Sequence, residues 1–186
     1  MERLGPWKPS KAEVAAAQDA SVADVIGPGL SVVFCGINPS LYSAAVGRHF
    51  ARPGNRFWPA LHAAGFSDRR LSPWDQDEFL RMGFGITNIA GRATATAAEL
   101  SADELVEGGQ LLRERMERYR PRFLAVLGVT AYRGAFGRPK AVLGLQAERM
   151  GETGIWVLPN PSGLNAHYQL ADLGRLYGEV RRAALG

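Results

Sequence analysis

Two Asn-Pro pairs are the residues of this chain best placed for chemistry, because each directly follows an apolar run. Asn38 and Pro39 stand in "CGINPS" after "LSVVF", and Asn160 and Pro161 stand in "PNPSG" after "IWVL". Proline fixes its own φ angle and holds the preceding residue extended, so each asparagine is a rigidly aimed amide. An amide can orient a water molecule, but it is no useful base near pH 7. Such chemistry therefore needs a leaving group that departs readily as an anion.

Short strands alternating with helices must position these amides. The predicted strands are nearly continuous apolar runs, with a weaker edge strand last: Ser31–Cys35, Gly85–Ile89, Phe123–Leu127, Ile155–Leu158 and residues 146–151. The predicted helices are Asn55–Ala64, Trp74–Met82, Ser101–Arg118, Thr130–Phe136 and Leu170–Leu185, and residues 40–45 can begin another. This alternation predicts an α/β fold, a three-layer α/β/α sandwich with a central, mostly parallel sheet of four to five strands.

Ligands of such sheets bind outside the carboxyl ends of the strands, where three polar loops are expected to meet. These loops are residues 36–58, 90–97 and 159–168. Arg92 and Thr94, in the second loop, either line the mouth of the site or cap a turn. The first loop contains Arg48, Arg52 and Arg56 but no Asp or Glu. The sequence leaves open whether these arginines face phosphate or only solvent.

Composition limits the alternatives. The 186 residues suit one domain, predicted over residues 25–186, with a partly ordered extension at residues 1–24. Cys35 is the only cysteine, which excludes a disulfide and a multi-cysteine zinc or iron–sulfur site; inside a strand it is expected to be a small buried hydrophobe. The net charge of +4 permits a polyanionic partner without requiring one. The sequence has no apolar run of about 18 residues, so we expect no membrane-spanning helix. We expect a cytoplasmic protein.

Four motifs in register resemble those of the mismatch-specific uracil-DNA and thymine-DNA glycosylases, within the uracil-DNA glycosylase superfamily. They are "GINPSLYSA", "HFARPGNRFW", "GITNI" with "GR" shortly after it, and "WVLPNPSGLN", between about Val25 and the C-terminus. The resemblance implies that Asn38 is the catalytic residue, holding the attacking water. It implies a pocket for the flipped base and a loop that enters the DNA. The implied pocket residues are Ile37, Pro39, Ser40, Ser43, Phe50 and Asn160, and the implied DNA wedge and backbone contacts are Ser162, Gly163, Leu164 and Asn165.

The resemblance implies a monofunctional DNA glycosylase that initiates base excision repair. It would flip uracil, and also thymine or other damaged pyrimidines, out of mismatched DNA and hydrolyse the N-glycosidic bond with water. The implied partner is double-stranded DNA with a G·U or G·T mismatch, with single-stranded DNA as an alternative. We expect no cofactor, no metal and no membrane partner, and a monomer that associates with the nucleoid of a bacterial cell through DNA.

Two departures from the family pattern keep other readings open. Ser40 replaces the last glycine of the common "GINPG", and the wedge loop continues as Asn165-Ala166-His167 where some relatives have an arginine that contacts the opposing guanine. The alternatives are a slow or non-catalytic sensor of mismatches or abasic sites, and a relative specialised for another damaged base, such as hypoxanthine or ethenocytosine.

Overall fold

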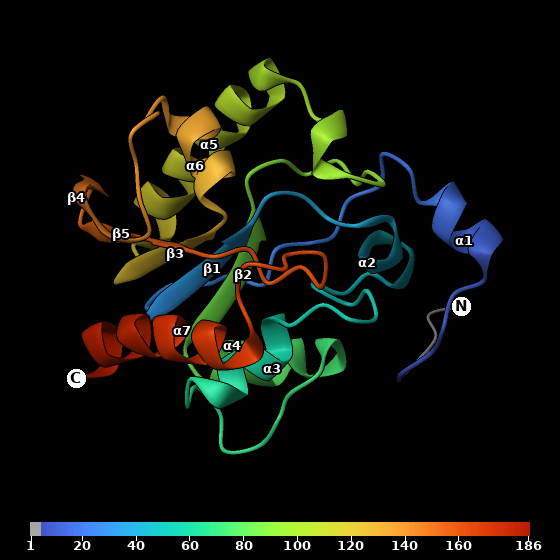
Figure 1. Ribbon diagram of the computed structural model, residues 1–186, viewed down its shortest axis with the longest axis horizontal. Coiled ribbons are helices and arrows are strands. Elements are labelled where there is room, and N and C mark those ends of the chain that lie inside the picture. The colour runs from blue at the N-terminus through green and yellow to red at the C-terminus, as the bar shows by residue number, and fades with distance from the viewer. Residues whose placement is uncertain (1–4) are drawn as a thin grey trace.

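A five-stranded sheet forms the middle layer of the molecule (Figure 1). The computed structural model describes residues 5–186 of the chain. The strand order is β2-β1-β3-β5-β4. The strands are β1 (Val32–Gly36), β2 (Phe84–Asn88), β3 (Phe123–Leu127), β4 (Gly144–Met150) and β5 (Thr153–Leu158). All neighbours pair in parallel except β4, which runs antiparallel to β5 at the edge. The predicted α/β fold with a mostly parallel sheet is confirmed.

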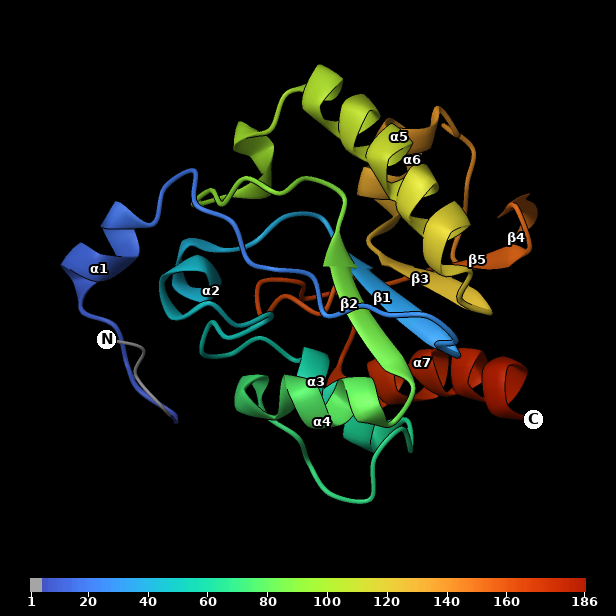
Figure 2. The ribbon, with the colours of Figure 1, turned by 180° about the vertical axis from the view of Figure 1, so that it is seen from behind.

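Helices cover both faces of this sheet, which gives three layers (Figures 1 and 2). One face carries α5 (Ala102–Tyr119) and α6 (Val129–Phe136), and the other carries α3 (Phe57–Ala63), α4 (Gln76–Arg81) and α7 (Leu170–Leu185). Outside these layers lie α1 (Lys11–Ala16), α2 (Leu41–Val46) and the 3₁₀ turns η1 (Pro73–Asp75) and η2 (Ala97–Glu99). Within residues 5–186 no helix is both long and apolar enough to cross a membrane.

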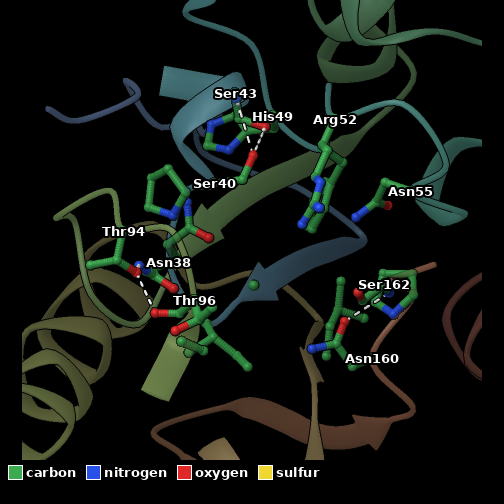
Figure 3. A pocket seen from close by; sticks show the side chains of 18 of the residues that line it. Asn38, Ser40, Ser43, His49, Arg52, Asn55, Thr94, Thr96, Asn160 and Ser162 are labelled. Atoms are coloured by element: carbon green, nitrogen blue, oxygen red, sulfur yellow. Dashed lines mark hydrogen bonds between the residues drawn. The ribbon is translucent and has the colours of Figure 1, made fainter. Parts of the chain in front are cut away.

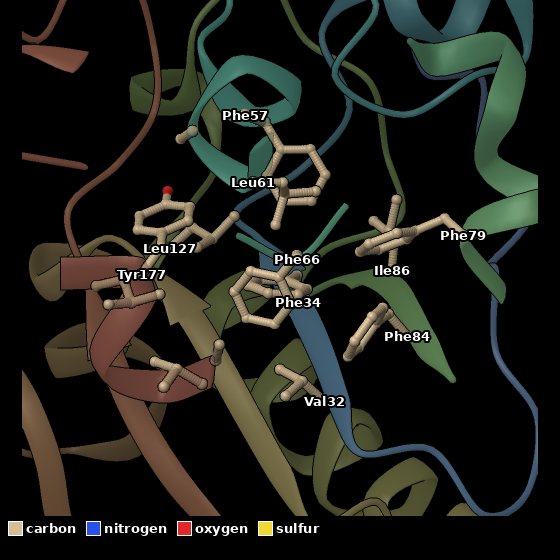
Figure 4. Close-up of a cluster of buried hydrophobic side chains, with 14 of the residues drawn as sticks. Val32, Phe34, Phe57, Leu61, Phe66, Phe79, Phe84, Ile86, Leu127 and Tyr177 are labelled. Atoms are coloured by element: carbon tan, nitrogen blue, oxygen red, sulfur yellow. The ribbon is translucent and has the colours of Figure 1, made fainter. Parts of the chain in front are cut away.

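The four parallel strands are almost entirely buried because they lie between two layers of helices, whereas the edge strand β4 alternates between exposed and partly buried residues. In β1, Val32 and Phe34 point toward α3, α4 and α7, whereas Val33 and Cys35 point toward α5 and α6. Phe34 is fully buried in an aromatic cluster, with its ring centroid 5.5 Å from that of Phe57 in an edge-to-face contact (Figure 4). Cys35 is a buried, free cysteine, as expected, and burial raises the pKa of its thiol.

The segment before β1 runs beside β2 and reaches the carboxyl end of the sheet. Val25 pairs with Ile86 in an antiparallel bridge, and farther along Asp19 N–H donates to the carbonyl of Ala93 at 3.0 Å. Asp24 accepts a hydrogen bond from the Thr87 hydroxyl at 2.8 Å. Residues 1–4 of the predicted extension lie outside the described residues.

Helix α5 crosses the end of β2 so closely that only glycine fits at one point of contact. A Cβ on Gly108 would lie 2.3 Å from the carbonyl oxygen of Ile89. We therefore expect Gly108→Ala to lower the free energy of unfolding by about 1–3 kcal/mol, because the helix must shift away from the sheet.

Urea denaturation measures this change, and Gly134→Ala in α6 is the matched control. Its Cβ would meet only the end of the Leu105 side chain, at 3.4 Å, so the intrinsic helix preference for alanine should leave it neutral or about 0.5–1 kcal/mol more stable. Equal effects of the two substitutions would contradict the close-contact explanation.

Candidate active site

A pocket opens at the carboxyl ends of the strands, where the three polar loops meet as expected (Figure 3). Eight of the eleven site residues that the resemblance implied line it: Ile37, Asn38, Pro39, Ser40, Ser43, Phe50, Asn160 and Ser162. Gly163 and Leu164 lie instead in an adjoining groove, and Asn165 lines neither hollow. The structure thus brings the predicted pocket residues together and places the predicted wedge beside them.

The side chain of Asn38 is held in one orientation by the 92–94 loop. Its Nδ2 donates to the carbonyl of Arg92 at 2.8 Å and to the Thr94 hydroxyl at 2.7 Å. The Thr94 hydroxyl donates in turn to the carbonyl of Thr96 at 2.7 Å. Both amide hydrogens are therefore engaged, and no residue in 5–186 donates to Oδ1, which remains free to accept a hydrogen bond from a water molecule.

Backbone pairing continues past the strands and brings this loop to Asn38. Ala90 N–H donates to the carbonyl of Ile37 at 2.9 Å, and Thr94 N–H donates to that of Pro39 at 3.3 Å. Of the two roles left open for the loop, Thr94 lines the pocket, whereas the Arg92 side chain holds the loop to its neighbours. Arg92 bonds Glu104 at 2.8 Å, and this contact lowers the pKa of Glu104 to about 2.

Gly36, at the end of β1, allows two pocket side chains to approach the strand. A Cβ there would lie 2.6 Å from Asn88 Oδ1 and 3.2 Å from Phe50 Cζ. The Phe50 ring is half-buried and stacks on the Phe57 ring at a centroid distance of 4.0 Å. Phe50 also lines the pocket. Phe50 has a φ of 52°, a left-handed conformation that the surrounding contacts must enforce.

Asn88 is a pocket residue that the sequence analysis missed. It ends β2, is 8% exposed and lines the pocket, and its side-chain amide has no hydrogen-bond partner within residues 5–186. The signal that could have pointed to it was an asparagine near the end of the predicted strand "GITNI". A buried amide of this kind can form hydrogen bonds with the polar atoms on the edge of a planar ligand.

Among residues 5–186 no carboxylate lines the pocket, and the ionisable side chains that do are those of His49 and Arg52. Burial lowers the pKa of His49, which therefore stays neutral at physiological pH. Its Nε2 lies 2.9 Å from the carbonyl of Ala23, which fixes that nitrogen as the protonated one. Within residues 5–186 no cluster of His, Cys, Asp or Glu could hold a metal ion. The groups that can bind a ligand here are mainly neutral amides and hydroxyls.

Arg56 holds the 159–168 loop in place from inside. Its guanidinium donates to the carbonyls of Ser162 at 2.7 Å and Asn165 at 2.9 Å, and also to that of Tyr168. At the tip of this loop, Leu164 is 79% exposed. A Cβ on Gly163 would lie 2.7 Å from the carbonyl oxygen of Gly54, so the loop rests directly on the first polar loop.

The three arginines of the first loop have different surroundings. Arg56 is occupied by the carbonyls just described, and the guanidinium of Arg48 lies over the ring of Trp74, 5.6 Å from its centroid. Arg52 is exposed and lines both the pocket and the adjoining groove, and its side chain has no hydrogen bond or ion pair within residues 5–186. Arg52 is therefore the one of the three that is free to bind a ligand at the rim.

Comparisons with known proteins identify the family and support the fold. The model of the uracil DNA glycosylase superfamily matches residues 23–180. Among solved structures, the fold is similar to the NMR solution structure of a candidate uracil DNA glycosylase from Methanosarcina acetivorans, with a TM-score of 0.57 and 17% sequence identity. The similarity covers 88% of this chain and 98% of that chain, and at this identity it supports the fold alone.

Removal of the Arg56 side chain should destabilise the 159–168 loop. Arg56→Ala leaves three loop carbonyls without their cationic donor, so we expect the free energy of unfolding to fall by about 2–3 kcal/mol. Amide hydrogen exchange should also become faster in residues 160–168 than elsewhere.

Arg52→Ala is the matched control, because it removes the same side chain four positions away where no partner is lost. Its stability should stay within about 0.5 kcal/mol of the wild type. Similar exchange rates for the loop in both variants would show that Arg56 is not its anchor.

Proposed function

The chain belongs to the uracil DNA glycosylase superfamily, and from that premise we propose that it excises uracil from G·U mismatches in DNA. Membership implies a DNA glycosylase, a hydrolase of N-glycosyl bonds. We extend the proposal to thymine in G·T mismatches and to other damaged pyrimidines. In this proposal the enzyme is monofunctional: it flips the base, hydrolyses the bond with water and so initiates base excision repair.

The observation that carries the proposal is the fixed amide of Asn38 in a pocket to which residues 5–186 contribute no carboxylate. We assign to Asn38 Oδ1 the role of accepting a hydrogen bond from the attacking water. The water oxygen adds to the anomeric carbon as the C–N bond breaks, and the electron pair leaves with the base as an anion. The proton that water loses passes to solvent or to the departing base, so the pocket needs no strong base for this step.

The absence of a lysine from the pocket lining favours direct hydrolysis over a covalent route. A Schiff base with the sugar requires an amine that reaches the anomeric carbon. The lysines of the chain are Lys8, Lys11 and Lys140, and none lies in the three loops. We therefore expect an abasic site as the product, without strand cleavage.

The walls of the pocket suit a flat, uncharged base. Phe50 offers an aromatic surface for stacking, and the free amide of Asn88 can hydrogen-bond the base and stabilise the charge that develops as it leaves. Ile37, Pro39 and Asn160 complete the walls.

The exposed tip of the 159–168 loop suits a wedge that enters the base stack. Leu164 is apolar and 79% exposed, and the loop that carries it is anchored by Arg56 and by the bond from Asn165 Nδ2 to the carbonyl of Asn160 at 3.0 Å. Extruding a base costs a few kcal/mol, less at a mismatch, and an inserted apolar side chain offsets part of that cost. In this role Ser162 and Gly163, which directly precede Leu164, form the backbone that supports the wedge.

Asn38→Ala is the direct test of the water-holding role. We expect the single-turnover rate of uracil release from a G·U duplex to fall by about 10²–10³-fold, because the water is no longer placed, while affinity for the duplex is retained. A·U, G·T and single-stranded substrates, measured alongside, define the preference. If the wild type binds mismatched DNA and releases no base from any substrate, the protein is a sensor and the catalytic assignment fails.

Arg52 is proposed to contact a DNA phosphate beside the wedge. Arg52→Ala should weaken binding to all duplex sequences alike and reduce the slope of log K against log salt by about one. Arg70→Ala, an exposed arginine that lines neither hollow, should leave the slope unchanged. A selective loss for duplexes with guanine opposite the lesion would indicate a contact with the base and not with phosphate.

A further inference from the structure

Two serine hydroxyls face each other in the wall of the pocket (Figure 3). Ser40 is the N-cap of α2, and its Oγ accepts a hydrogen bond from Ser43 N–H at 3.1 Å. The two Oγ atoms are 3.0 Å apart, and Ser43 Oγ also accepts from Ala51 N–H at 3.0 Å. Ser43 is only 3% exposed and Ser40 is partly buried, so bulk water has little access to Ser43.

The hydrogen-bonding capacity of the pair is not exhausted by these contacts. Two hydroxyls have two protons and four acceptor positions between them. One proton and one acceptor position are used in the bond between them, and two backbone N–H groups occupy two more acceptor positions. Whichever hydroxyl donates to the other, one proton remains on one oxygen and one acceptor position on the other, without a partner among residues 5–186.

A donor and an acceptor on adjacent oxygens complement a base edge that has a carbonyl beside a ring N–H. Uracil, thymine and hypoxanthine have such an edge, whereas ethenocytosine has no ring N–H to offer. A buried donor or acceptor that a ligand leaves unpaired costs binding free energy, so the pair discriminates against bases that cannot complete it.

We propose that Ser40 and Ser43 form a base-reading pair that selects bases with a carbonyl next to an N–H, and that Ser40 is a specificity-determining residue. The inference rests on the proposed glycosylase function and assigns the substrate class of its pocket. The proposal gives a function to Ser40, which stands where the common form of the first motif has glycine. Without the Ser40 hydroxyl, Ser43 alone would have to present both donor and acceptor from one oxygen, and one of the two bonds would be lost.

A purely structural role for Ser40, as the cap of α2, makes a different prediction. Capping affects helix stability and would change the response to every base alike. Ser40→Thr keeps both the cap and the hydroxyl, whereas Ser40→Ala removes both. Ser10→Ala removes an equivalent, exposed cap from α1 and serves as the control for loss of a cap alone.

The test measures affinity for duplexes that contain uracil, hypoxanthine or ethenocytosine on a 2′-fluoro sugar, which resists cleavage of the glycosidic bond. Ser40→Ala should weaken binding to the uracil and hypoxanthine duplexes about five- to tenfold more than binding to the ethenocytosine duplex, the loss expected for one hydrogen bond. Ser40→Thr and Ser10→Ala should keep the wild-type preference. An equal loss for the three bases, or none, overturns the proposal.

Base release from the corresponding cleavable duplexes separates this inference from the proposed function. If the wild type releases no base but Ser40→Ala still loses the binding preference, the reading pair stands and the glycosylase activity fails. If the wild type releases uracil and Ser40→Ala shows the wild-type preference among bases, the activity stands and the reading pair is wrong.

Discussion

The bonds from Asn38 Nδ2 to the Arg92 carbonyl and the Thr94 hydroxyl are the interaction on which the rest of the site depends. They fix the direction of Oδ1 and join the segments that follow the neighbouring strands β1 and β2. Through the Arg92 side chain the same loop is tied to Glu104 in the first turn of α5 and to Asp19 in the segment before β1. Because the pKa of Glu104 is lowered to about 2, this ion pair stays charged throughout the physiological range. The amide is thus oriented by elements from three distant parts of the sequence.

A pocket built this way limits the chemistry that it can catalyse. Neutral amides, hydroxyls and an uncharged histidine can place a water molecule and stabilise an anion, but they cannot remove a proton efficiently at neutral pH. In the proposed reaction, selectivity then has to come from the fit and hydrogen bonding of the base, and from the ease with which it is extruded.

The sequence predicted the elements whose signals are local and missed the contacts that join distant segments. Phe123–Leu127 and Leu170–Leu185 agree with the structure residue for residue, because a continuous apolar run and a long amphipathic pattern are both local. Arg48, Arg52 and Arg56 could not be told apart, because the bonds of Arg56 reach carbonyls more than 100 positions away. The departure at Ser40 was visible, but the bonds of Ser43 Oγ with Ser40 Oγ and with Ala51 N–H depend on how the first loop folds back on α2.

The proline that follows each Asn-Pro asparagine also protects that amide from chemical ageing. Asparagine deamidates when the backbone nitrogen of the next residue, freed of its hydrogen, attacks the side-chain carbonyl, and a proline nitrogen has no hydrogen to lose. Asn38 and Asn160 are therefore barred from the cyclic imide that leads to aspartate. At position 38 the protection matters, since a carboxylate would turn an acceptor toward the carbonyl of Arg92, where an N–H donor is needed. The rigid turn that aims the amide also gives it a long chemical lifetime.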